Sequence, residues 1–313
     1  MTAYIVRRLL STIPVMTVVA ICVFLLLHLA PGDPAAIIAG DNATPESIAQ
    51  IRAKLGLDDP LIVQFGRWVW NLLQGDFGIS IFSNVPVLEL VGQRLEPTLS
   101  LAATTLFVAV TIAITIGVLA AWKAGGLLDR FVMGFAAMGF SVPVFVVGYL
   151  LIYLFAIELR WLPVQGYKPI AEGIWPWLRN LILPSVALGM AYVALIARIT
   201  RASMLEVLAE DYMRTAKAKG VATRPMLLRH ALKNAAVPIV TVIGIGVALL
   251  ISGVVITETV FNVPGIGRLT VDAISKRDYP IIQGVMILCA GAYVLINLLV
   301  DLTYTFLDPR IRY

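Results

Sequence analysis

The residues best suited to bind a charged partner are concentrated in one segment, residues 198–238. This segment carries eight Lys/Arg and only three Asp/Glu. Three of its basic residues are expected to reach water or a partner, namely Arg214, Lys217 and Lys219. At helical spacing, the opposite face presents residues that can pack, which are Leu205, Leu208, Tyr212 and Ala216. This pattern predicts either the docking of a partner or the ordinary anchoring of a basic loop on the cytoplasmic side of a membrane.

Residues for covalent or nucleotide chemistry are missing from the sequence. No Gly is followed by Lys anywhere, so the phosphate-binding loop G-x-x-x-x-G-K-[ST] cannot form. The two histidines, His28 and His230, are predicted on opposite sides of a bilayer, and no H-E-x-x-H metal motif exists. Residues 139–143 superficially resemble a nucleophile turn around Ser141, but the second Gly is absent and no histidine is predicted nearby. We interpret that segment as a span kinked by Pro143.

The elements that position these residues are predicted to be membrane helices. Of the 313 residues, 59% are hydrophobic and 14% are charged, with a mean hydropathy of +0.90, whereas soluble domains carry about 25% charged residues. A membrane-spanning helix needs about 20 apolar residues. Six stretches qualify, at residues 9–30, 98–122, 131–157, 181–203, 236–257 and 281–306. The first is longer than the core of a secretory signal and is interpreted as a retained span. The expected fold class is an all-α protein with six transmembrane helices.

The distribution of charge predicts the orientation of these helices. With both termini in the cytoplasm, the inner segments carry fourteen Lys/Arg and five Asp/Glu, while the longer outer segments carry ten Lys/Arg and thirteen Asp/Glu. The opposite orientation would put the most basic short loop on the translocated side, which the positive-inside rule disfavours.

This topology predicts three regions. Residues 1–30 form the cytoplasmic N-terminus and first span, residues 31–97 an outer helical loop, and residues 98–313 a five-span core. In the outer loop, Thr44-Pro45 is predicted to start a helix that Gly56 ends. The core contains a cytoplasmic loop at residues 204–235, called the elbow below. Gly220 is expected to end the first helix of the elbow, and Pro225 to lie in the first turn of the second.

The second helix of the elbow is expected to pack through Leu228, Leu232 and Ala235. The spans themselves contain almost no ionisable residue that could carry a coupling ion. Arg198, Glu258 and Asp301 lie toward span ends, where we expect rim or snorkelling positions. Energy must then come from a cytoplasmic partner. The alternatives are a stand-alone secondary transporter or channel, and a membrane scaffold that recruits a signalling protein.

Several strings, in order along the chain, resemble the permease subunits of ATP-binding-cassette (ABC) importers of the dipeptide/oligopeptide/nickel branch. They lie at residues 28–34, 55–58, 75–78, 210–220, 230–234, 258–268, 278–280 and 308–313. The resemblance assigns coupling to an ATPase to the elbow as a unit, through Glu210, Asp211, Tyr212, Arg214, Thr215, Ala216, Lys217, Lys219 and Gly220. It assigns an outer-loop signature to Pro31, Gly32, Asp33, Pro34, Phe261, Asn262, Pro264, Gly265, Gly267 and Arg268.

What the resemblance implies is a type I importer permease fold in the bacterial cytoplasmic (inner) membrane. The implied partners are a second related permease chain, two cytoplasmic P-loop ATPase subunits and an extracytoplasmic solute-binding protein, and no nucleic acid. The chain would be no enzyme and would hold no cofactor or metal, because ATP and Mg would be used by the ATPase subunits. Its cargo would be a short peptide or peptide-like solute. His28 and Asp33 would contact the docked binding protein or be satisfied within the chain.

Overall fold

The computed structural model describes residues 2–29, 33–39 and 44–307, and nearly all of them are helical. The outer segment and the first span contain α1 (Thr2–Leu29), α2 (Pro34–Ala39), α3 (Pro45–Leu55) and α4 (Leu61–Leu73). The following part contains α5 (Val87–Trp122), α6 (Leu127–Ser141), α7 (Val144–Leu151), the π-helix η1 (Ile152–Glu158), the 3-10 helix η2 (Ile170–Glu172) and α8 (Ile174–Ala209).

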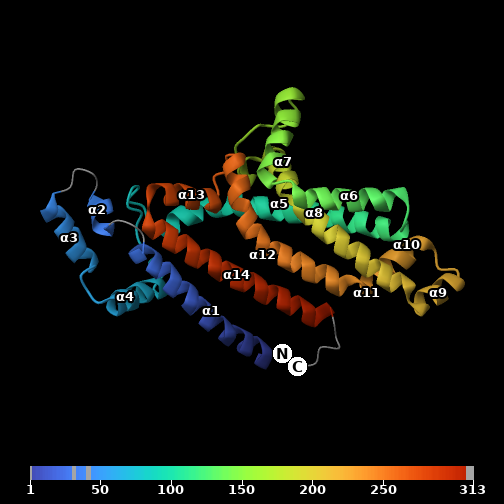
Figure 1. The fold of residues 1–313 in the computed structure, drawn as a ribbon, viewed down its shortest axis with the longest axis horizontal. Coiled ribbons are helices and arrows are strands. Elements are labelled where there is room, and N and C mark those ends of the chain that lie inside the picture. Colours follow the sequence, from blue (N-terminus) through green and yellow to red (C-terminus); the bar gives the residue numbers. More distant parts are fainter. Residues whose placement is uncertain (1, 30–32, 40–43, 308–313) are drawn as a thin grey trace. The chain divides into compact units, whose positions relative to one another are not determined.

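The elbow contains α9 (Asp211–Ala218), α10 (Thr223–Pro225), the π-helix η3 (Met226–Ala231) and α11 (Leu232–Asn234). The chain then continues through α12 (Ala236–Val260), α13 (Ile266–Lys276) and α14 (Tyr279–Leu307) (Figure 1). Helices dominate because lipid offers no hydrogen-bond partners to the backbone, so an apolar segment must bond within itself. The predicted all-helical membrane class is confirmed.

The candidate membrane spans, judged by length and composition, overlap the six predicted stretches. Four single helices are long and apolar enough, at Leu10–Leu29, Val87–Trp122, Ile174–Ala209 and Tyr279–Val300. Two bent helix pairs raise the number of candidates to as many as six. The pair Thr223–Asn234 and Ala236–Val247 bends by 65° at the junction of the elbow with α12. The other pair joins α6 to α7 and η1, which follow each other in different directions (Figure 1).

The predicted span at residues 131–157 is broken at Pro143, where the sequence predicts a kink. α6 ends at Ser141, Val142 is extended with φ −96° and ψ 122°, and α7 starts after Pro143. The ring of a proline clashes with helical backbone at the residue before it, which explains why Val142 leaves the helix. The hydroxyl of Ser141 donates to the carbonyl of Ala137 at 3.0 Å, a local helix contact.

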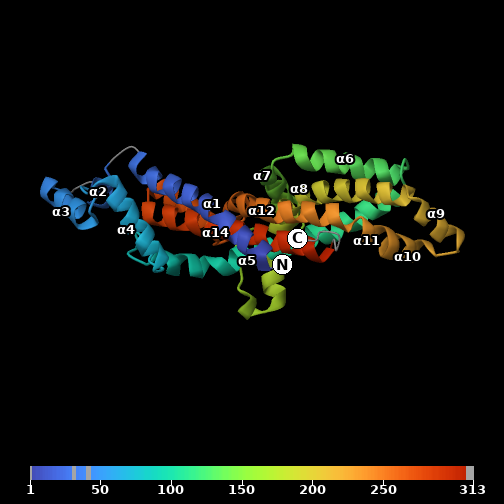
Figure 2. The same ribbon diagram turned by 90° about the horizontal axis from the view of Figure 1, so that it is seen from below.

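The chain divides into two compact units. Unit 1 contains Met1–Leu95 and Leu269–Val294, and unit 2 contains Glu96–Arg268 and Leu295–Arg312. These borders differ from the three predicted regions, which stay a prediction. In unit 2, α8 is the central helix and packs against α6, α7 and α12, with α6 running alongside it (Figure 2).

Small residues allow the helices of unit 2 to approach closely. A Cβ atom on Gly117 of α5 would lie 2.7 Å from Thr200 of α8, and one on Gly139 of α6 would lie 2.9 Å from Ala194 of α8. Association of helices in lipid depends on such close packing, because burial of apolar surface gains little there. These glycines of α5 and α6 therefore help to position α8, which carries the elbow at its C-terminal end.

In unit 1, helix α3 of the outer loop begins and ends where predicted. Thr44 caps α3 by accepting a hydrogen bond from the Ser47 amide at 3.3 Å, and Gly56 ends the helix with φ 63°. Gly75 follows α4 with φ 84°. On α4, Phe65 and Trp68 pack against Phe24 of α1, with ring centroids 5.3 and 5.8 Å apart. These aromatic residues thus fix the outer loop to the first span.

Candidate functional site

The backbone of the elbow changes direction at two positions, which its dihedral angles identify. At Glu210 the chain is extended, with ψ 147°, and this residue separates α8 from α9. At the other end, Gly220 has φ 79°. The amide of Val221 donates to the carbonyl of Ala216 at 3.2 Å, and the amide of Gly220 donates to that of Lys217 at 3.0 Å. This pair of bonds is a Schellman motif, which explains why a glycine stands there.

The elbow has two arms, α9 and the segment formed by α10, η3 and α11. The packing face of the first arm differs from the predicted one. Tyr212 is 44% exposed, whereas Met213 is 3% exposed. The prediction of Leu205, Leu208, Tyr212 and Ala216 on one face assumed a continuous helix. Because Glu210 interrupts it, α9 starts with a new helical phase and buries Met213 instead.

The second arm shows a similar shift of one residue. Leu227 is 6% exposed, while the predicted packing residue Leu228 is 48% exposed. The π-helix η3 adds one residue to a turn and so changes which side chains face inward. Pro225 does lie in the first turn of this arm, as predicted.

A buried apolar cluster, called the elbow core, joins both arms to the spans. It comprises Val118 and Ala121 of α5, Met204 of α8, Met213 of α9, and Leu227, Ala231, Ala235 and Ile239. The two arms are also linked directly, because the side-chain amide nitrogen of Asn234 donates to the Tyr212 hydroxyl at 3.0 Å. The elbow is therefore a folded element attached to the ends of α5 and α8.

The polar side of the elbow is open. Arg214, Lys217 and Lys219 are all exposed. Arg214 lies 3.4 Å from Asp211, and both side chains of this pair remain largely exposed, at 76% and 95%. A surface pair of this kind adds about 0.3–0.5 kcal/mol to a helix. These cations are thus available to a partner surface.

A buried ion pair beside the elbow was not predicted. Asp129, at the start of α6, is 4% exposed and accepts two hydrogen bonds from the Arg201 guanidinium of α8, one of them 2.7 Å long. It also accepts from the Gly125 amide at 2.9 Å. The pair fixes the α5–α6 turn to α8 about two turns before Glu210. No local pattern reveals it, because its two residues are 72 positions apart.

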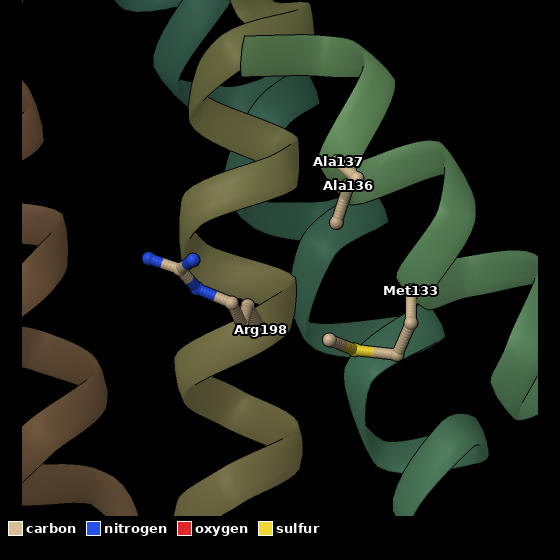
Figure 3. Close-up of a pocket in the computed structure, with 4 residues that line it drawn as sticks. All are labelled: Met133, Ala136, Ala137 and Arg198. Carbon is tan, nitrogen blue, oxygen red and sulfur yellow. The ribbon is translucent and has the colours of Figure 1, made fainter. Parts of the chain in front are cut away.

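A shallow hollow lies further along α8. It is lined by Met133, Ala136 and Ala137 of α6 and by Arg198 of α8, with a volume of about 280 Å³. The side chain of Arg198 extends away from α6, while Met133 points toward α8 (Figure 3). Arg198 is exposed, in agreement with a snorkelling position. The lining of the hollow is therefore apolar except for the charged side chain of Arg198.

The outer end of unit 2 is organised around a buried carboxylate. Glu258 of α12 is fully buried, which corrects the rim position expected for it. Its carboxylate accepts from the Thr98 hydroxyl at 2.6 Å and from the Arg268 amide at 2.9 Å. The Thr98 hydroxyl in turn accepts from the Ile266 amide at 2.8 Å. Burial is tolerated because these donors replace water.

Three residues of the outer-loop signature lie against this carboxylate, namely Gly265, Gly267 and Arg268, and we call residues 258–268 the outer turn. A Cβ on Gly265 would overlap the Glu258 carboxylate, and one on Gly267 would lie 2.6 Å from Val255. Glycine is needed at both positions because neighbouring atoms lie too close for a side chain. The Arg268 guanidinium donates to the Asn262 side chain, and Phe261 is 2% exposed within an apolar cluster.

The remaining signature residues belong to unit 1. Asp33 accepts from Arg52 at 2.8 Å and from the Ala35 amide at 3.0 Å. The hydrogen bond with Arg52 holds the pKa of Asp33 below its ordinary value. Pro34 begins α2. Pro31 and Gly32 lie outside the described residues, as does the predicted tail at residues 308–313.

His28 is satisfied within unit 1. Its ring contacts the Phe24 carbonyl at 3.2 Å and the Gln64 side-chain oxygen at 3.1 Å. The Gln64 amide nitrogen donates to the carbonyls of Leu57 and Asp59, at 3.0 and 2.8 Å. Through Gln64, the His28 side chain thus connects the end of α1 to the loop before α4.

Comparison with known proteins matches nearly the whole chain to one family. The sequence profile described as "Binding-protein-dependent transport system inner membrane component" matches residues 113–313, and its N-terminal counterpart matches residues 1–102. A probable peptide ABC transporter permease of Sinorhizobium fredii is 64% identical over 100% of both chains. The glutathione transport system permease protein GsiC of Salmonella typhimurium is 45% identical over 100% of both chains.

Among solved structures, the inward-facing MetNI methionine ABC transporter resembles the fold. The alignment has a TM-score of 0.57 and 16% identity, and it covers 71% of this chain and 97% of that chain.

Proposed function

Because the chain belongs to the family of inner membrane components of binding-protein-dependent transport systems, we propose that it is the permease of an ATP-driven importer for short peptides or peptide-like solutes. A member of this family with several apolar helices is a multi-pass protein of the bacterial inner membrane. The proposal of a peptide-like cargo is supported by the peptide and glutathione permeases among the relatives.

In the proposed assembly, this chain pairs with a second related permease chain to form the translocation path. Two cytoplasmic P-loop ATPase subunits bind ATP and Mg, and an extracytoplasmic binding protein delivers the cargo. The chain itself makes and breaks no bond. The lack of a phosphate-binding loop in its sequence supports this division of labour.

The observation that carries the proposal is the construction of the elbow. Its cations are exposed, and the elbow core attaches the helix that carries them to α5 and α8. A force applied to residues Tyr212 to Gly220 would be transmitted to two candidate spans through buried side chains instead of being absorbed by a loose loop. We propose that the elbow docks on an ATPase subunit and that closure of the ATPase pair tilts these spans.

The test is a pair of glycine variants. Gly220 and Gly125 both have positive φ, 79° and 77°, and a Cβ on either meets no atom within 4 Å. Gly220→Trp places a bulky ring on the proposed docking surface, while Gly125→Trp puts the same change on the α5–α6 turn. In proteoliposomes of the complete importer, Gly220→Trp should insert normally but lose ATP-driven uptake. Gly125→Trp should transport. Normal uptake by Gly220→Trp would contradict the proposed docking surface.

The assembly itself is tested by purifying the tagged chain gently from native membranes and identifying co-purified proteins by mass spectrometry. A second six-span chain and P-loop ATPases are expected. The ligand bound to the co-purified binding protein would identify the cargo. Recovery of the chain alone, with flux driven by an ion gradient, would support the secondary transporter instead.

A further inference from the structure

An open apolar groove separates α5 from the second arm of the elbow. Its lining comes from Ile114, Val118, Leu119 and Trp122 of α5 and from Leu227 and Leu228 of the arm, with Arg224 beside them. The volume is about 360 Å³. Val118 and Leu227 form the buried floor, at 5% and 6% exposure. Trp122 and Leu228 remain about half exposed, at 49% and 48%, so the groove is accessible from outside unit 2.

The groove changes in polarity along its length. From Ile114 to Trp122 the floor follows α5 for about 12 Å, at about 1.5 Å per residue. Its inner part is apolar except for Thr115, whose hydroxyl donates to the Thr111 carbonyl at 2.7 Å. Its mouth carries Trp122, whose ring lies 5.5 Å from the Lys123 ammonium, and the Arg224 guanidinium. No acidic residue lines it, and within the described chain Arg224 forms no ion pair. The mouth of the groove is therefore cationic, and its interior is mainly apolar.

This polarity matches one kind of ligand. Tryptophan marks the level of the lipid headgroups, and basic clusters just inside a span attract anionic lipids. The positive-inside orientation puts Trp122 at the cytoplasmic surface and Ile114 in the hydrocarbon region. We propose that the groove binds an anionic phospholipid, with its acyl chain along Leu119 and Leu228 and its phosphate between Arg224 and Lys123.

Depth and charge favour this occupant over a protein. A water-soluble ATPase subunit contacts the exposed side of the elbow but does not reach residues about two helical turns inside the bilayer. A helix of another membrane chain would bring apolar surface, and it would leave the two cations at the mouth without a counter-charge. A phospholipid supplies both an acyl chain and a negative headgroup, and it would bridge α5 to the arm that the elbow core already holds.

The experiment measures lipid retained by the purified protein. The full-length chain, with whatever subunits accompany it, is extracted from bilayers of equal phosphatidylglycerol and phosphatidylcholine, and bound lipid is quantified by native mass spectrometry. We expect a preference for phosphatidylglycerol of roughly five-fold or more, the factor expected from each basic group near a headgroup. Arg224→Gln should abolish most of this preference, and Leu119→Trp should remove the retained lipid by filling the groove.

Two control variants carry matched changes outside the groove. Arg229→Gln removes the same charge from an exposed position of the same arm, and Leu99→Trp adds the same ring to an exposed position of α5. Both should retain lipid as the native protein does. Equal retention of the two lipids, or undiminished retention by Leu119→Trp, would overturn the proposal. Cross-linking of a Leu228→Cys variant to a second membrane chain across the groove would also overturn it. None of these readouts depends on uptake, so they remain informative if the importer assignment fails.

Discussion

The outer turn and the elbow stand at opposite ends of unit 2's long helices and are built in opposite ways. In the outer turn, a fully buried carboxylate is held by the Thr98 hydroxyl and the Arg268 amide, with glycines packed against it. In the elbow, the buried part is apolar and the charged part is open. The first satisfies its polar groups within the chain, whereas the second leaves its charged groups exposed.

This difference predicts where a substitution damages folding and where it damages only function. A buried polar network loses hydrogen bonds that nothing replaces, because water is excluded. An exposed cation loses little, because water replaces its partner. Variants of the outer turn should therefore lower the free energy of unfolding, while charge variants of the elbow should leave it nearly unchanged.

The largest effect is expected from Glu258→Ala. It leaves the Thr98 hydroxyl and the Arg268 amide without their acceptor and opens a cavity, at a cost of about 3 kcal/mol in the free energy of unfolding. The denaturation midpoint of the purified chain in detergent is the measurement. Glu206→Ala, which removes an exposed glutamate of α8, should change it by less than about 0.5 kcal/mol. Equal costs for the two variants would show that the outer turn is not a buried network.

The next largest effect on the free energy of unfolding is expected at Gly265, which lies close to Glu258. A Cβ there would overlap the Glu258 carboxylate, so Gly265→Ala should cost about 2 kcal/mol through overpacking. Gly134→Ala is the control, because Gly134 is helical and nothing lies within 4 Å of an added Cβ. It should be neutral or slightly stabilising. Thermal unfolding of both variants in the same detergent is the measurement, and a tolerated Gly265→Ala would mean that the turn can relax.

A smaller effect is expected at the turn of the elbow. Gly220 needs its positive φ but has open space around it, so Gly220→Ala should cost about 1 kcal/mol, and the cost should stay local. Gly220→Asn should cost less, because asparagine tolerates this conformation. Amide hydrogen exchange over residues 211–221 measures both. A cost as large as that of Gly265→Ala would show a tightly packed elbow and would remove the contrast between the two regions.

The features predicted correctly from sequence are those that depend on local chemistry. Gly220 ends α9, Pro225 begins an arm, and Thr44 caps α3, because each position requires a particular backbone angle or a side-chain acceptor. Likewise, long apolar stretches must be helices in lipid. These constraints act within a few residues, so the sequence displays them directly.

The errors arise where local patterns are interrupted or where partners are distant. Met213, and not the predicted Tyr212, is buried in the elbow core. The helix break at Glu210 that causes this change could not be predicted, because no proline or glycine marks it. Leu227 is buried where Leu228 was predicted, because the π-helix η3 changes which side chains of the second arm face inward. The burial of Glu258 depends on Thr98, 160 residues away. Only tertiary packing could reveal that interaction.

The smallest effect belongs to Asp33 and Arg52 of unit 1, an exposed counterpart to the buried Glu258 carboxylate. The hydrogen bond from Arg52 lowers the pKa of Asp33 below its ordinary value of 3.8. The ionised form is therefore favoured in the folded protein, and the pair stabilises α2 and α3 at pH values above the unfolded pKa. This contribution disappears as the pH falls through the lowered folded pKa.

Hydrogen exchange of residues 35–39 and 44–55, corrected for the intrinsic rate, measures this contribution. Asp33→Asn should be less protected than the native chain at about pH 6 and equal to it at a pH below the lowered folded pKa of Asp33. Because both side chains are partly exposed, the difference at about pH 6 should be modest and should shrink in high salt. A difference that persists at the lowest pH would mean that Asp33 acts through its shape or its bond to the Ala35 amide, and not through its charge.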